Sequence, residues 1–169
     1  MKRPNILNIY TATLLGCAVL SANAAAQQKS LKEQLVGAWT LVSSEITEKD
    51  GTKQPDFGSI PKGIMIFDAG GKYTQILERP DRPKFKASEN LRMDTPAAEY
   101  GEAARGYGAA FGTWSVNEAD KTLIRRIEGS LIPNAEGREV KASVSLADSE
   151  LKLSGTASNG IKVDQLWKR

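Results

Sequence analysis

The sequence predicts an all-β protein, an eight-stranded antiparallel up-and-down barrel with one short helix between the third and fourth strands. Short segments with β-type patterning recur after residue 35, bounded by Gly, Pro, Asn and Asp. Nearly all of them are joined by turns of two to five residues, which is typical of antiparallel neighbours. Only one segment of the predicted mature chain has convincing helix signals. Eight such strands can close into a barrel wide enough to hold one small ligand.

Residues 1–26 have the layout of a secretory signal peptide. Lys2 and Arg3 precede a mostly apolar run over 6–20, and small residues follow as far as Ala26. The run is shorter than the ~20 apolar residues of a membrane-spanning helix. We therefore expect cleavage after Ala24 or Ala26, leaving residues 27–169 as one barrel domain in the periplasm or outside the cell.

The signal segment also contains an alternative anchor. Leu14-Leu15-Gly16-Cys17 looks like the lipobox of bacterial lipoproteins, in which Cys17 is lipidated and holds the protein at the outer membrane. Against this, Leu15 is larger than the residue usual at its position, and apolar sequence continues past Cys17 to a good peptidase site. The cleaved form is favoured, and the lipoprotein stays as the alternative.

The first half of the barrel begins after a polar segment, 27–34, that is a tether or a helical lead-in. The first strand ends at the turn Asp50-Gly51. The next stretch is predicted to be a loop, because it contains Pro55, Gly58 and Pro61. A hairpin around Gly70-Gly71 follows, and two prolines end it because proline does not suit a central strand. The corresponding ranges are 36–48 for the first strand, 54–62 for the loop, 63–68 and 72–78 for the hairpin, and 79–83 for its end.

The helix and five strands make up the second half. Thr95 is the expected N-cap, Pro96 the first helical residue, and Gly106 and Gly108 end the helix of 95–105. Each later strand alternates in polarity and ends at a turn or loop rich in Asn, Asp, Gly or Pro. These strands are expected at 110–116, 121–128, 138–146, 151–154 and 161–167.

The composition excludes several kinds of function. The chain has no histidine, the commonest general base and metal ligand, and its single cysteine lies in the predicted signal. It has 23 basic and 20 acidic residues, so without Lys2 and Arg3 the count is 21 against 20 and the net charge is +1. The charges are interspersed, which argues against nucleic acid or an anionic membrane as partner. We expect no metal, no cofactor and no catalytic residue, and favour a protein that is not an enzyme.

An ordered set of motifs points to a family. Gly37-Ala38-Trp39 opens the first strand, and the set continues with Asp50-Gly51, Pro61-x-Gly63-x-Met65-x-Phe67, Gly70-x-x-Tyr73, Arg79-Pro80-x-x-Pro83, Phe111-Gly112-Thr113, Glu128-Gly129-Ser130, Pro133-Asn134 and Trp167-Lys168-Arg169. Over roughly residues 35–169, this set resembles the bacterial lipocalin-like domain family, small β-barrels of the calycin type.

The resemblance implies a fold and a pocket rather than a reaction. In such barrels the first-strand tryptophan closes one end and stacks on a basic residue from the end of the chain. Trp39 with Lys168 or Arg169 is the corresponding pair, a structural role worth about 0.5–2 kcal/mol. The family often has histidine at the position of Arg126, so its replacement here puts an acid–base role at this site in doubt.

Two polar groups are candidates for a pocket mouth. The first is the arginine-rich loop at Arg79 with the following helix, where Tyr100 and Tyr107 form a lid over an acidic or hydroxylated ligand. The alternative is a structural role, in which the loop is solvated and the tyrosines only pack the helix against the barrel. The second group is Arg126 and Glu128, which share a face because neighbours two apart in a strand point the same way.

The opposite face of that strand holds Leu123, Arg125 and Ile127, and the pattern alone leaves open which face points inward. If Arg126 and Glu128 point outward, they form a cross-strand ion pair. We expect them inward, lining one open end together with Tyr73, Arg79, Tyr100 and Tyr107, while bulky aromatics close the other end.

The favoured function is therefore the binding of a small apolar or amphipathic molecule inside an exported barrel. A cyclase or isomerase that uses the cavity is one alternative, distinguished by a carboxylate such as Glu128 inside it with a perturbed pKa. An envelope structural protein with a filled barrel is another, distinguished by the volume of the cavity.

Overall fold

The computed structural model describes residues 29–86, 96–157 and 159–169. Together these three ranges hold nine strands and two α-helices. The predicted signal peptide, including Cys17, and the expected N-cap Thr95 lie outside the described residues.

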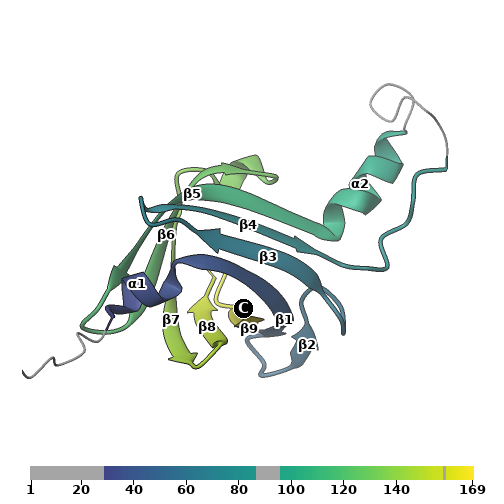
Figure 1. The fold of residues 1–169 in the computed structure, drawn as a ribbon. Coiled ribbons are helices and arrows are strands. Elements are labelled where there is room, and N and C mark those ends of the chain that lie inside the picture. Colours follow the sequence, from purple (N-terminus) through teal and green to yellow (C-terminus); the bar gives the residue numbers. More distant parts are fainter. Residues whose placement is uncertain (1–28, 87–95, 158) are drawn as a thin grey trace, which may run out of the picture.

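These residues form a closed antiparallel barrel. The sheet has nine strands in the order β2-β1-β3-β4-β5-β6-β7-β8-β9, and β1 also pairs with β9, which closes the ring (Figure 1). Eight strands therefore make the barrel and β2 is an addition at its edge. The bounds are β1 Gly37–Thr47, β2 Lys53–Pro55, β3 Lys62–Phe67, β4 Lys72–Glu78, β5 Tyr107–Asn117, β6 Thr122–Ser130, β7 Glu139–Ala147, β8 Glu150–Thr156 and β9 Lys162–Lys168, with helices α1 Leu31–Leu35 and α2 Ala97–Arg105 and a 3-10 turn η1 Pro133–Ala135.

The short strand β2 is where the fold departs from the expected loop over 54–62. It pairs only with β1, in the register Glu45 with Pro55 and Thr47 with Lys53. A proline is tolerated there because an edge strand has one side on which its backbone donates no ladder hydrogen bond. The expectation that this whole stretch is a loop is therefore wrong for Gln54 and Pro55.

One end of the barrel is closed by aromatic side chains, as the sequence predicts. Trp39 and Trp167 are fully buried there, and the Phe67 and Trp114 rings lie 4.7 Å apart between their centroids. Helix α1 covers this end with the buried Leu35 and begins with a capping box of Ser30 and Glu33, the Ser-x-x-Glu pattern of a helix start. The apolar core extends from this end along the barrel and includes Leu35, Trp39, Leu41, Met65, Phe67, Tyr73, Leu77, Trp114, Leu123, Ala142, Val144, Leu151, Leu153 and Trp167.

The end of the chain returns to the first strand. The Arg169 guanidinium lies 4.1 Å from the centroid of the Trp39 ring, and it also donates to the carbonyl of Gln34. The Trp39 indole nitrogen donates to the carbonyl of Leu35 at 2.8 Å. Of the two basic residues that the sequence offers for this contact, the structure uses Arg169, while Lys168 pairs with Glu150 at 3.0 Å.

The opposite end is open. Because successive strands run antiparallel from α1, the segment between β1 and β3 and the connections after β4, β6 and β8 all emerge at the end away from α1. Helix α2 follows β4 and stands away from the barrel wall (Figure 1). Tyr107 is the first residue of β5 and not part of the helix or a lid, because the extended backbone resumes directly after Gly106.

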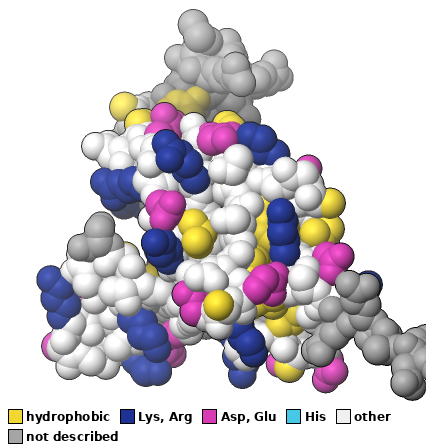
Figure 2. Space-filling model, turned by 90° about the vertical axis from the view of Figure 1, so that its left-hand side faces the viewer, with side chains coloured by type: hydrophobic (Ala, Val, Ile, Leu, Met, Phe, Trp, Pro, Cys, Tyr) yellow, Lys and Arg dark blue, Asp and Glu magenta, His cyan; other side chains and the backbone are white. Residues whose placement is uncertain are grey.

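The outer surface is mixed in charge and also exposes apolar side chains such as Ile60, Phe111 and Ile132. On the face in Figure 2, Lys and Arg side chains are interspersed with Asp and Glu, as the sequence pattern indicates. Within the described part of the chain, no helix has the length and apolar character needed to cross a membrane.

Candidate functional site

The main candidate site is a cavity at the open end of the barrel, with a volume of about 500 Å³. It lies between β4 and β6 on one side and β7, β8 and β9 on the other, with η1 at its rim. Its wall is formed by Gln75, Arg125, Ile127, Ala135, Arg138, Glu139, Val140, Lys141, Ala142, Leu153, Gly155, Thr156, Ala157, Val163 and Gln165. Pockets for small molecules typically have volumes of about 300–1,000 Å³ and mostly apolar walls with a few fixed polar groups, and this cavity fits that description.

Arg125 is the one charged side chain in the described core, and it is 9% exposed. Strand β6 places it inward because Leu123 and Ile127, its neighbours two residues away, also face the interior. Its guanidinium lies where the cavity meets the packed core: Nη1 donates to Gln75 and to the sulfur of Met65, and the Tyr73 ring centroid lies 5.9 Å away.

The charge of Arg125 is not neutralised by the rest of the described chain. Its Nε is buried without a hydrogen-bond partner, and none of the described ion pairs includes it. Burial lowers the pKa of this guanidinium, but arginine stays protonated in proteins, so the positive charge remains. A buried charge without a counterion costs several kcal/mol, which makes Arg125 the most unusual feature of the barrel.

One further cation stands at the cavity wall. Arg138 is at the rim, whereas Glu139 and Lys141 are register partners of the outward Arg126 and Ile124, so their side chains lie on the outer face, where they pair at 3.2 Å. Among the described wall residues, the cations that remain are therefore Arg125 and Arg138.

A polar network lies at the β1–β9 side of the wall. Gln165 donates to the buried hydroxyl of Ser44 at 3.3 Å, and that hydroxyl donates to the Asp56 carboxylate at 3.2 Å. Burial raises the pKa of Asp56, although the hydrogen bond from Ser44 acts against the shift. The network fixes the side chain of Gln165, whose amide forms part of the cavity wall.

The residues predicted to line the mouth do not form the wall of this cavity. Arg126 and Glu128 point outward, so their expected inward orientation is wrong, and Glu128 pairs with Lys72 of β4 at 2.9 Å. The physical reason is that the apolar residues of β6 share a face with Arg125, so that face turns to the core. Tyr73 lies in the core rather than at the open end and reaches the site only through Arg125.

The arginine-rich loop and the tyrosines form a separate group outside the barrel. Arg82 lies 4.7 Å from the Tyr107 ring centroid, pairs with Glu78 at 2.9 Å and holds α2 through the carbonyl of Ala103. Arg79 pairs with Asp81 at 2.9 Å. The ring of Tyr100 packs against Phe85, with centroids 5.1 Å apart. These contacts attach α2 to the barrel.

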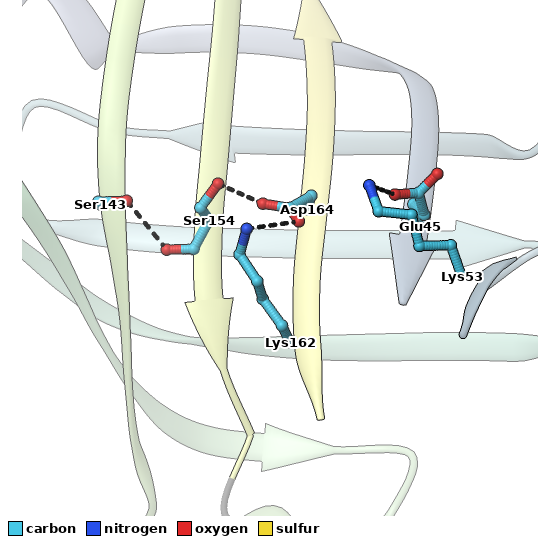
Figure 3. Close-up of polar contacts among 6 residues, drawn as sticks. All are labelled: Glu45, Lys53, Ser143, Ser154, Lys162 and Asp164. Carbon is cyan, nitrogen blue, oxygen red and sulfur yellow. Dashed lines mark hydrogen bonds and ion pairs between the residues drawn. The ribbon is translucent and has the colours of Figure 1, made fainter. Parts of the chain in front are cut away.

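A second polar cluster lies on the outer face of β7, β8 and β9 (Figure 3). Ser143, Ser154 and Asp164 are register partners across these strands. The Ser143 hydroxyl donates to the Ser154 carbonyl at 3.2 Å, the Ser154 hydroxyl donates to Asp164, and Lys162 pairs with Asp164 at 3.0 Å. Burial opposes ionisation of Asp164, but the Ser154 hydrogen bond and Lys162 hold its pKa below the ordinary value. The cluster is paired within itself and stabilises the sheet.

Residues 36–168 match a family model described as a lipocalin-like domain. This chain belongs to the lipocalin-like domain family. The resemblance seen in the sequence is thereby confirmed over nearly the whole described barrel. No curated protein matches the chain.

Solved structures similar to this lipocalin-like barrel have low sequence identity to it. A redesigned β-barrel is 17% identical with a TM-score of 0.43, over 83% of this chain and 98% of that one. A lipocalin-like protein from Bacteroides uniformis is 17% identical with a TM-score of 0.41, over 80% of this chain and 97% of that one. The amine binding protein of Rhodnius prolixus, in its tryptamine complex, is 12% identical with a TM-score of 0.41, over 79% of this chain and 62% of that one.

Arg125 is the site residue that the sequence interpretation missed. A signal for it was present: Arg125 lies between Leu123 and Ile127 at spacings of two, whereas Arg126 lies between Ile124 and Glu128. Two apolar neighbours on one face mark the side of a strand that turns to the core. In the lipocalin-like barrel this rule applies even though the residue between them is charged.

Proposed function

We propose that this lipocalin-like barrel binds a small amphipathic molecule in the cavity at its open end. The observation that carries the proposal is a cavity of about 500 Å³ whose wall is apolar at Ile127, Leu153 and Val163 and polar at Arg125. A barrel that served only as a structural element would gain stability from a filled interior, because empty apolar space costs packing energy.

The cavity also bears on the enzyme alternative. That alternative needs a carboxylate inside the barrel, and Glu128 lies on the outer face in an ion pair with Lys72. Glu139 pairs with Lys141 on the outer face of β7. Burial raises the pKa of the Asp56 carboxyl, but Asp56 is not among the residues of the cavity wall, so the proposal is binding.

We test this function with N-phenyl-1-naphthylamine, a neutral dye whose emission rises in apolar surroundings. Ile127→Trp places a large side chain into the cavity wall. The matched control is Ile124→Trp, the same change on the same strand but on the outer face, because residues three apart point to opposite sides. Far-ultraviolet circular dichroism checks the fold of each variant.

The wild type and Ile124→Trp should bind the dye equally, and Ile127→Trp should bind it at least ~10-fold more weakly because the cavity is occupied. Equal binding by both variants, or no binding by the wild type, would contradict the proposal.

We also propose that the protein is exported and acts in the periplasm or outside the cell. The support is the sequence of residues 1–26, with its basic start, apolar run and small residues before Gln27. N-terminal sequencing of protein from its own host should give a start at Ala25 or Gln27. A lipid-modified Cys17 would instead support an outer-membrane lipoprotein.

A further inference from the structure

The cavity contains a charge that the barrel itself does not neutralise. Arg125 is 9% exposed, forms part of the cavity wall, and has no carboxylate partner among the described residues. A guanidinium has five N–H donors, and the described chain supplies acceptors only to Nη1, namely Gln75 and Met65. The donors of Nε and Nη2 therefore have no protein partner in the described chain.

From this, we propose that the ligand is an amphipathic carboxylate whose anionic group enters first and pairs with Arg125 at the base of the cavity. This inference rests on the proposed function, because it places the anion in the same cavity. The planar fork of arginine matches the two oxygens of a carboxylate, so one ligand group satisfies two donors at once.

The surroundings of Arg125 determine which end of the ligand binds where in the cavity. On the core side lie the Met65 sulfur and the Tyr73 ring, and within the cavity lie Ile127, Leu153 and Val163. A carboxylate gains binding free energy by pairing with Arg125, whereas an apolar chain gains it by burial against the aliphatic wall. Arg125 at the base and Arg138 at the rim favour entry of an anion over a cation.

The matched probes are decanoate and 1-decanol, which share a chain length and differ in the charged group. Each displaces N-phenyl-1-naphthylamine from the purified protein, and calorimetric titration of decanoate gives its affinity without the dye. The variants are Arg125→Met, which removes the charge while keeping a long side chain, and Arg126→Met, which removes the neighbouring charge from the outer face. Arg125→Gln replaces the first variant if Arg125→Met does not fold.

The wild type and Arg126→Met should bind decanoate about 10- to 100-fold more tightly than 1-decanol, as expected for a charge-assisted hydrogen bond to a buried group. Arg125→Met should lose this preference while still binding the dye and the alcohol. If the wild type binds the dye but does not distinguish the two probes, or if Arg125→Met keeps the preference, the anion site is refuted while the binding cavity stands. Absence of any dye, decanoate or decanol binding refutes the proposed function itself.

Discussion

Replacing Arg125 by methionine should leave the ligand-free protein at least as stable as the wild type. An uncompensated buried charge costs several kcal/mol. Against this, the variant loses the hydrogen bond to Gln75, worth about 1.5–3 kcal/mol for a charged donor, and the contact with the Tyr73 ring, worth about 2 kcal/mol for a desolvated pair. Methionine keeps the apolar stem of the side chain. We therefore expect the free energy of unfolding to stay equal or to rise by up to about 2 kcal/mol.

The assay is urea unfolding of ligand-free protein, followed by tryptophan fluorescence, since Trp39, Trp114 and Trp167 are all buried in the core. The matched control is Arg126→Met on the exposed face of the same strand, for which we expect a change within about 0.5 kcal/mol. Truncation of a well-packed core residue ordinarily costs about 2–5 kcal/mol. A loss of that size in Arg125→Met would show that Arg125 serves the fold, and would refute the idea that its charge is kept for a ligand.

Two further predictions concern stability. Arg169→Ala should lower the free energy of unfolding by about 1–3 kcal/mol, because it removes a cation stacked on a buried indole and a hydrogen bond to a carbonyl. Lys168→Ala, which breaks only an exposed ion pair, should cost less than about 1 kcal/mol, and equal losses in urea unfolding would contradict this account. Because burial raises the pKa of Asp56 above 3.8, the protonated form is favoured in the folded protein, and stability falls as the pH rises from that value through the raised pKa. Asp56→Asn should therefore gain stability relative to the wild type between about pH 4 and pH 7 in urea midpoints, and a constant difference across that range would rule this out.

The barrel was predictable from sequence because its signals are local. Turn residues at short spacing give antiparallel neighbours, and the contact of Trp39 with Lys168 or Arg169 follows from a motif at each end of the domain. The start of β5 was harder to predict. Gly108 looked like a helix stop, but it lies on the strand, where a Cβ would come within 3.3 Å of the Phe57 ring. The glycine makes room for packing and does not form a turn.

The candidate site was less predictable, because it depends on which face of one strand turns inward. Polar residues two apart on one strand face, Arg126 and Glu128, predict a polar lining of the open end. The strand instead turns Leu123 and Ile127 to the interior, and Arg125 follows because a strand alternates without exception over this stretch. Cavities depend on how distant strands approach one another, so the 500 Å³ space between β6 and β9 has no local sequence signal.

The most direct test of the proposed anion site is the guanidinium Nε–H resonance of Arg125 in a ¹H–¹⁵N spectrum, assigned by its absence from Arg125→Met. Titration with decanoate should shift this resonance along the same saturation curve as the calorimetric isotherm, because the carboxylate hydrogen-bonds the guanidinium. The Arg126 resonance on the outer face should not move. Saturation of the protein by decanoate while the Arg125 resonance stays in place would contradict the claim that this buried arginine receives the ligand.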